Sequence, residues 1–124
     1  MRSSKVELAL RGLALLIAAG FIVFNIRSVI SGPQLPLFII LENTAYSLLL
    51  AIPAAVYKRP ISPAFLLLAS AFMAGRVSRS VVTPTGELAA LAIAHAPLLA
   101  SLMLIALLGF ATLLRMRDDE GLKA

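Results

Sequence analysis

The chain has 124 residues, of which 60% are apolar and 14% are charged. A soluble domain of this length is about 45–50% apolar, so lipid is the expected solvent for much of this surface. The absence of cysteine and the single histidine exclude disulfides, thiolate metal sites and a bis-histidine haem site within one chain. The net charge of +5 comes from basic residues at the edges of apolar runs, which is typical of membrane orientation and not of nucleic-acid binding.

Long apolar segments follow one another along the chain and are separated by short polar or Gly–Pro breaks. Each has roughly the 20 residues that cross about 30 Å of hydrocarbon. Because the connections are short, consecutive segments are expected to pack as antiparallel neighbours. The sequence therefore predicts a single all-α domain over 1–124, an up-down-up-down bundle of four transmembrane helices. The predicted spans are 8–30, 36–57, 63–83 and 87–114.

The first apolar run follows a basic opening, as in a signal peptide. It is longer than a typical signal-peptide core and lacks a clear small-x-small cleavage site, so we interpret it as a retained helix.

The distribution of basic residues predicts the orientation of this bundle. Eight fall at the N-terminus, in the second loop or in the tail, and only Arg27, Arg76 and Arg79 fall on the other side. The positive-inside rule places the side with more Lys and Arg in the cytoplasm. We therefore expect a multi-pass protein of the cell membrane with both termini cytoplasmic. The eight residues are Arg2, Lys5, Arg11, Lys58, Arg59, Arg115, Arg117 and Lys123.

Several polar residues lie inside or beside the predicted spans. A charge near the middle of a bilayer costs about 2.5–3.5 kcal/mol on insertion scales, so such residues are expected to be paired or functional. Helical spacing predicts that polar faces of the second, third and fourth helices converge, the last including Ser101 and Thr112. The half nearer the cytoplasm is predicted to be almost purely apolar. The candidate polar cluster in the outer half comprises Glu42, Asn43, Tyr46, Arg76, Arg79, Glu87 and His95.

Glu42 and Arg76 form the most informative pair in this cluster. Glu42 lies sixteen residues before Lys58, and Arg76 lies sixteen residues after Pro60. Both are therefore expected about 24 Å above the connecting turn, at one height on neighbouring helices. The sequence predicts an ion pair, which either fixes helix register or handles a proton or a ligand.

Two further interpretations concern the other members of the cluster. Arg76 with Arg79 is a candidate site for an anionic lipid or a small anion. His95 is interpreted as a partner in an interhelical hydrogen bond or as a proton relay.

Small residues at four-residue spacing predict close helix contacts. The pattern occurs at Ala71 and Gly75 on the third segment, and at Ala92, Ala96 and Ala100 on the fourth. The fourth segment has a second face of small and polar residues. One of its two faces is expected to pack inside the bundle, and the other is available to a second subunit.

The length and the four-span layout resemble those of the small multidrug-resistance transporters. Those proteins carry an essential glutamate in their first helix, whereas the predicted first span here contains none. The candidate in this chain is Glu42, in the second span.

No catalytic, nucleotide-binding or metal-binding signature occurs, so we expect no enzyme activity and no cofactor. The first interpretation is a non-catalytic subunit of a larger respiratory or transport assembly. Its expected partners are the lipid bilayer and other membrane subunits or further copies of itself, with no nucleic acid. The alternative is a homo-oligomeric transporter or channel for an ion or small solute that uses Glu42, Arg76 and His95. A quinone- or haem-associated anchor, using His95, and an intramembrane enzyme rank below these two.

Overall fold

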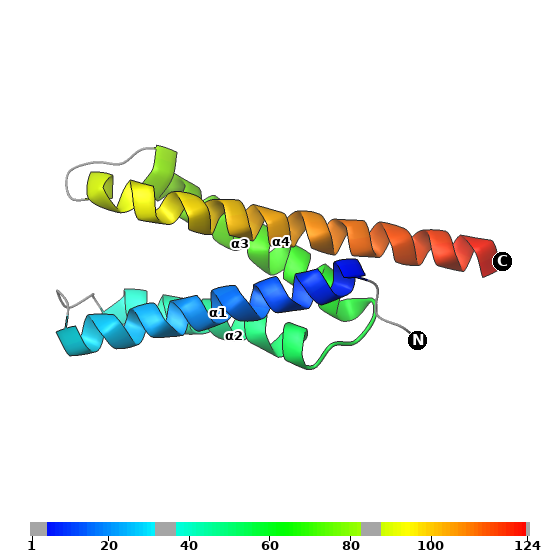
Figure 1. Ribbon diagram of the computed structural model, residues 1–124, viewed down its shortest axis with the longest axis horizontal. Coiled ribbons are helices and arrows are strands. Elements are labelled where there is room, and N and C mark those ends of the chain that lie inside the picture. The colour runs from blue at the N-terminus through cyan, green and yellow to red at the C-terminus, as the bar shows by residue number, and fades with distance from the viewer. Residues whose placement is uncertain (1–4, 32–36, 83–87, 124) are drawn as a thin grey trace.

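In the computed structural model, which describes residues 5–31, 37–82 and 88–123, the chain is helical except for a turn at residues 56–60 (Figure 1). This confirms the predicted all-α fold with four helices. Each helix contains a stretch that is long and apolar enough to cross a membrane, by length and composition. The helices are α1 (Lys5–Ser31), α2 (Leu37–Ala55), α3 (Ile61–Val82) and α4 (Leu88–Lys123).

The helix boundaries differ from the predicted spans at two informative places. Helix α1 begins at Lys5 and so includes Glu7, which the predicted span omitted. Helix α4 continues to Lys123, nine residues past the predicted end at 114, so the charged tail is helical. Arg, Met, Glu and Lys are good helix formers, and the tail contains no proline. Helix α4 therefore has 36 residues and is about 54 Å long. A loss of apolar character ends a membrane span, but it does not end a helix.

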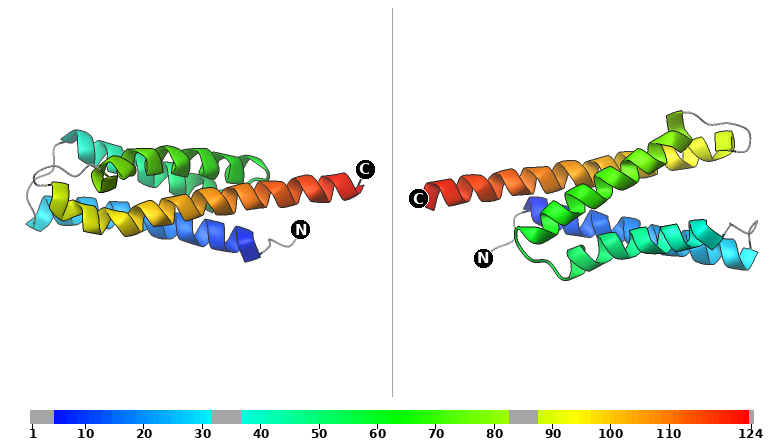
Figure 2. Two further views of the ribbon diagram at one scale, coloured as in Figure 1. Left: turned by 90° about the horizontal axis from the view of Figure 1, so that it is seen from above. Right: turned by 180° about the vertical axis from the view of Figure 1, so that it is seen from behind.

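The four helices associate as two closely packed pairs. Helix α1 lies mainly against α2, and α3 lies mainly against α4, while α1 also contacts α4 and α2 contacts α3. The start of α1, the α2–α3 turn and the end of α4 lie together at one end of the molecule, here called the terminal end (Figure 1). The opposite end is called the loop end. The two pairs diverge toward the loop end, and α4 projects past the other helices at the terminal end (Figure 2).

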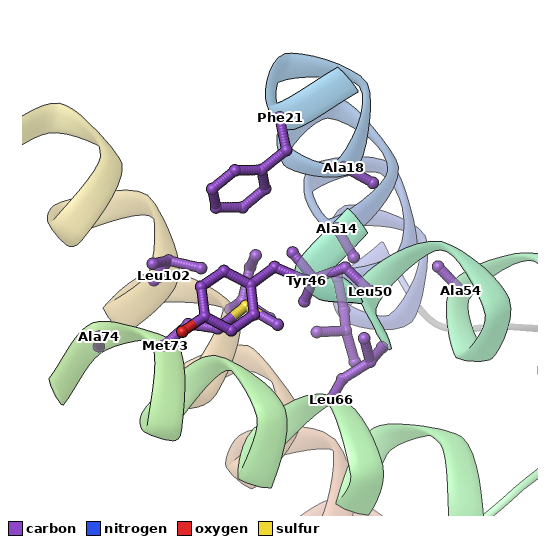
Figure 3. Close-up of a cluster of buried hydrophobic side chains, with 12 residues drawn as sticks. Ala14, Ala18, Phe21, Tyr46, Leu50, Ala54, Leu66, Met73, Ala74 and Leu102 are labelled. Carbon is purple, nitrogen blue, oxygen red and sulfur yellow. The ribbon is translucent and has the colours of Figure 1, made fainter. Parts of the chain in front are cut away.

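A narrow core joins all four helices, while most large apolar side chains face outward. Leu10, Leu50, Leu66, Met73 and Leu102 are fully buried at the centre. The Tyr46 ring lies among the core side chains, with its centroid 5.8 Å from that of Phe21 (Figure 3). In contrast, 24 large apolar side chains are exposed, among them Leu16 at 66% and Leu68 at 71%. Apolar exposure on this scale is expected of a surface that contacts lipid or other proteins.

Helices α3 and α4 approach closely at a glycine that the small-residue patterns did not include. A Cβ atom on Gly109 of α4 would lie 3.0 Å from the carbonyl oxygen of Pro63 and 3.3 Å from Cβ of Leu67. The backbones of α3 and α4 approach this closely because position 109 lacks a side chain. Gly75, by contrast, has nothing within 4 Å of its Cβ position, so it makes no close contact within this chain.

Candidate functional site

The predicted ion pair between Glu42 and Arg76 forms across α2 and α3. Nη2 of Arg76 lies 3.1 Å from Oε1 and 3.3 Å from Oε2 of Glu42, and its Nε lies 3.3 Å from Oε1. The Tyr46 hydroxyl, one helical turn from Glu42, donates a hydrogen bond to the same Oε1. The pair is partly open, because 50% of the Arg76 side chain and 26% of the Glu42 side chain are exposed. Equal spacing from the α2–α3 turn correctly predicted the pairing.

Asn43 joins a different group of polar residues, between α1 and α2. Its Nδ2 donates to Oδ1 of Asn25 at 3.0 Å. Nδ2 of Asn25 lies 3.2 Å from both the carbonyl oxygen of Ile40 and Oγ1 of Thr44. Asn25 is 7% exposed, so its amide is satisfied within the protein as a buried polar group requires. The predicted cluster is therefore split between the two sides of α2.

Sequence reasoning missed Asn25 as a functional or structural residue. Its position carried a usable signal, because Asn25 lies six residues before the end of α1 and Asn43 lies six residues after the start of α2. Equal distances from the break bring two residues of antiparallel neighbours to one height, as they do for Glu42 and Arg76. An amide in an apolar segment needs a polar partner at its own height.

Of the remaining members of the predicted cluster, the structure describes Arg79 and His95. Arg79 is exposed, one turn beyond Arg76 on α3. Glu87 lies outside the residues that the structure describes. Nδ1 of His95 on α4 is buried without a hydrogen-bond partner among the described residues.

Two residues of the predicted polar face of α4, Ser101 and Thr112, form hydrogen bonds within their own helix. The hydroxyl groups of Ser101 and Thr112 each donate, at 2.8 Å, to a carbonyl of their own helix, those of Pro97 and Leu108. A serine or threonine in an apolar helix can satisfy its hydroxyl in this local way. Both hydroxyl groups are therefore satisfied within their own helix.

A second ion pair lies at the terminal end, just outside the predicted spans. Glu7 of α1 accepts hydrogen bonds from Arg59 of the α2–α3 turn, with 2.9 Å between Nε of Arg59 and Oε2 of Glu7 and a second contact from Nη2 to Oε1. The Glu7 side chain is only 3% exposed. Nε of Arg11, one turn along α1, donates to the carbonyl oxygen of Ala54 at 2.9 Å. Its guanidinium lies 5.0 Å from the centre of the Tyr57 ring, within cation–π range.

Tyr57 and Arg59, which lie beside Glu7, each keep one protonation state near neutral pH. Burial, and next the neighbouring Glu7 carboxylate, raise the pKa of Tyr57 well above its ordinary value. The hydrogen bond to Glu7 raises the pKa of Arg59. At neutral pH Tyr57 is therefore neutral and Arg59 charged, so neither residue exchanges a proton near pH 7.

The turn between α2 and α3 is tightly held, which explains how Arg59 is positioned. The backbone N–H of Lys58 donates to Oγ of Ser62 at 2.8 Å, and the N–H of Ser62 donates to the carbonyl of Lys58 at 2.7 Å. The Ser62 hydroxyl in turn donates to the carbonyl of Val56 at 3.3 Å. Arg59 and Pro60 are joined by a cis peptide bond. The turn residues thus hold Arg59 beside the first helix.

The described residues contain no group of three or more His, Cys, Asp or Glu side chains that could hold a metal ion. A groove of about 410 Å³ runs between α1 and α2 at the loop end. Its two polar side chains, Asn25 and Thr44, are hydrogen-bonded to each other. The groove is otherwise aliphatic, with the lining Ile22, Asn25, Ile26, Val29, Ile30, Ile40 and Thr44.

The polar residues thus join pairs of segments and do not converge on one reaction centre. The buried Glu7–Arg59 pair links α1 to the α2–α3 turn, the Asn25 group links α1 to α2, and the Glu42–Arg76 pair links α2 to α3. Comparison of the chain with known protein families, with curated proteins and with solved structures finds no match.

Proposed function

We propose that this chain is a multi-pass protein of the cell membrane and a non-catalytic subunit of a larger membrane protein assembly. In this proposal the bundle crosses the bilayer up-down-up-down, with both termini in the cytoplasm. Four helices of sufficient length and apolarity support the insertion. The large number of exposed apolar side chains supports it further, because lipid or neighbouring subunits would cover them.

The observation that carries the proposal is the pairing of polar groups within the chain. Glu7 with Arg59, Glu42 with Arg76, and Asn25 with Asn43 each join two segments. Intramembrane charges that bond to each other set helix register and avoid the cost of an unpaired charge.

The proposed orientation is tested with reporter fusions. It rests on the eight basic residues on the terminal side against three on the other. Reporters at the N-terminus, after Arg59 and at the C-terminus should all report cytoplasm, and reporters near Gly32 and Thr85 should report the outside. A C-terminal reporter on the outside would mean an odd number of spans and would reject the topology.

The proposed role is tested by purification from native membranes in a mild detergent, followed by mass measurement of the intact complex. We expect other polypeptides in fixed ratio to this chain. A preparation that contains this chain alone, with no other polypeptide, would argue against the subunit role.

The partial exposure of the Glu42–Arg76 pair favours one second candidate, a homo-oligomeric transporter or channel for an ion or small solute. In that case Glu42, Arg76 and His95 line a path and the carboxyl group binds a proton or exchanges a ligand. Infrared difference spectroscopy distinguishes the candidates. A carboxyl band that changes between about pH 6 and 8 and is lost in Glu42→Gln would favour transport, whereas its absence would favour the structural subunit.

A further inference from the structure

The Glu42–Arg76 pair lies on the outer surface of the bundle, along the seam between α2 and α3. This seam has less extensive contact than the α1–α2, α3–α4 and α1–α4 seams. Half of the Arg76 side chain is exposed. The aromatic residues one turn away, Phe38 before Glu42 and Phe72 before Arg76, are also exposed, at 64% and 61%. Charged and aromatic groups therefore share one outward-facing surface, here called the α2–α3 face.

The distance of Glu42 and Arg76 from their helix ends favours a second protein surface over this pair. Glu42 lies five residues after the start of α2, and Arg76 lies six residues before the end of α3. Both are therefore about 7–9 Å inside the helix ends. The guanidinium of Arg76 is directed to Glu42 by three contacts. Ionisable groups at such depths almost always face protein or a water-filled cavity.

We infer that a second copy of this chain covers the α2–α3 face. The charges of the face select this occupant, because a carboxylate and a guanidinium lie side by side and each has an exposed edge. A lipid phosphate would complement the arginines Arg76 and Arg79 but not Glu42, and it would compete with Glu42 for Arg76. A second copy related by a two-fold axis presents a guanidinium to Glu42 and a carboxylate to Arg76, and the interface becomes a cluster of four alternating charges.

The backbone of α3 allows this approach. Gly75 is exposed beside Arg76, and the space around its Cβ position is empty to 4 Å. Ala71, one turn away, is exposed as well. Small residues on an outer face let two helices approach closely in a membrane. This dimer interface rests on the proposed membrane insertion, but it does not depend on the presence of other subunits.

Mixing two charge variants tests the interface directly. In Glu42→Arg all four side chains of the cluster are arginine, and in Arg76→Glu all four are glutamate, so neither variant should form a dimer with itself. An equimolar mixture should form a one-to-one dimer, because every contact across the two-fold axis then joins opposite charges. Native mass measurement with a mass tag on one variant gives the result. Dimers of each variant alone, or a mixture that stays monomeric while the wild type is dimeric, would overturn the inference.

A second measurement covers the case in which the charge variants do not fold. The chain has no cysteine, so one introduced thiol reports one position, with all four charges intact. Gly75→Cys should form a disulfide-linked dimer in oxidised membranes. Val23→Cys is the matched control, since Val23 is 62% exposed on α1 and lies eight residues from its helix end, against seven for Gly75. The control should remain monomeric.

The outcomes separate the dimer from the proposed subunit role. Equal cross-linking at positions 75 and 23, or none at 75, would reject the α2–α3 interface. A monomer that carries an anionic lipid lost in Arg76→Gln would also reject it and would assign the face to lipid. Neither result bears on whether other polypeptides co-purify, which tests the proposed function separately.

Discussion

Two ion pairs that link different segments of the described chain join the same residue types in opposite settings. At the terminal end, the Glu7 side chain is 3% exposed and its partner Arg59 is 31% exposed. At the loop end, Glu42 is 26% exposed and Arg76 is 50% exposed. The helices are close together at the first pair and diverge near the second (Figure 2). Removing one partner of an ion pair lowers stability most where the other partner remains buried. We therefore expect the terminal pair to stabilise the fold and the loop-end pair to form part of a contact surface.

The largest effect is expected from removing the positive member of the buried pair. Arg59→Gln leaves the Glu7 carboxylate buried without its ion-pair partner, which should lower the free energy of unfolding by about 3 kcal/mol. Glu7→Gln should cost less, since Arg59 is partly exposed and its guanidinium can turn toward water. Denaturant titration in mild detergent measures both. Arg117→Gln is the control, because it breaks a pair whose side chains are 76% and 68% exposed. Equal losses from Arg59→Gln and Arg117→Gln would contradict the comparison.

Close packing at the terminal end is tested by adding a single methyl group. Gly109→Ala places a Cβ atom 3.0 Å from the Pro63 carbonyl oxygen, so α3 and α4 must move apart at a cost of about 1–3 kcal/mol. Gly20→Ala is the matched control within α1, since nothing lies within 4 Å of its Cβ position. The control should be neutral or stabilising, because alanine favours a helix more than glycine does. A stable Gly109→Ala would mean that the two helices are farther apart than described.

At the loop end the individual losses should be smaller. Glu42→Gln and Arg76→Gln each leave a partly exposed partner, and we expect a smaller loss of stability in detergent than for Arg59→Gln, as for pairs near a protein surface. The charge-swapped double variant should recover part of this loss. A double-mutant cycle gives the coupling between the two residues. If the single variants are neutral and the double variant is additive, Glu42 and Arg76 do not meet. A loss of stability as large as that of Arg59→Gln would contradict the expected difference between the two ion pairs.

The smallest effect concerns alkaline pH and again separates the two ends. Burial raises the pKa of Tyr57 above its ordinary value of 10.0, so the folded protein retains a proton that the unfolded chain releases. The associated stability is present below about pH 10 and is lost as the pH rises toward the pKa of the folded state. Unfolding measured between pH 8 and 11 should show this decline, and Tyr57→Phe should reduce it. An unchanged pH dependence in Tyr57→Phe would mean that Tyr57 is not buried beside Glu7.

Much of the loop-end polar arrangement follows from counting residues. The positions of Glu42 and Arg76 relative to the α2–α3 turn predicted their contact, because antiparallel helices with equal rise bring equidistant residues to one height. The same rule, applied to the first break, relates Asn25 to Asn43. Counting along the chain could not place Glu7, which precedes the predicted first span at 8–30. Its burial depends on the α2–α3 turn approaching α1, a contact between segments more than fifty residues apart.

The sequence by itself determined the four apolar helices, because length and composition are sufficient to specify segments that can cross a membrane. It also determined where charges occur along them. Only the tertiary structure determined how deeply each charge is buried and which helices approach closely. The burial of Glu7, the close contact at Gly109 and the exposure of Arg76 all depend on how the two helix pairs meet and diverge. That geometry is set by side-chain packing between distant segments, and no periodicity along one segment encodes it.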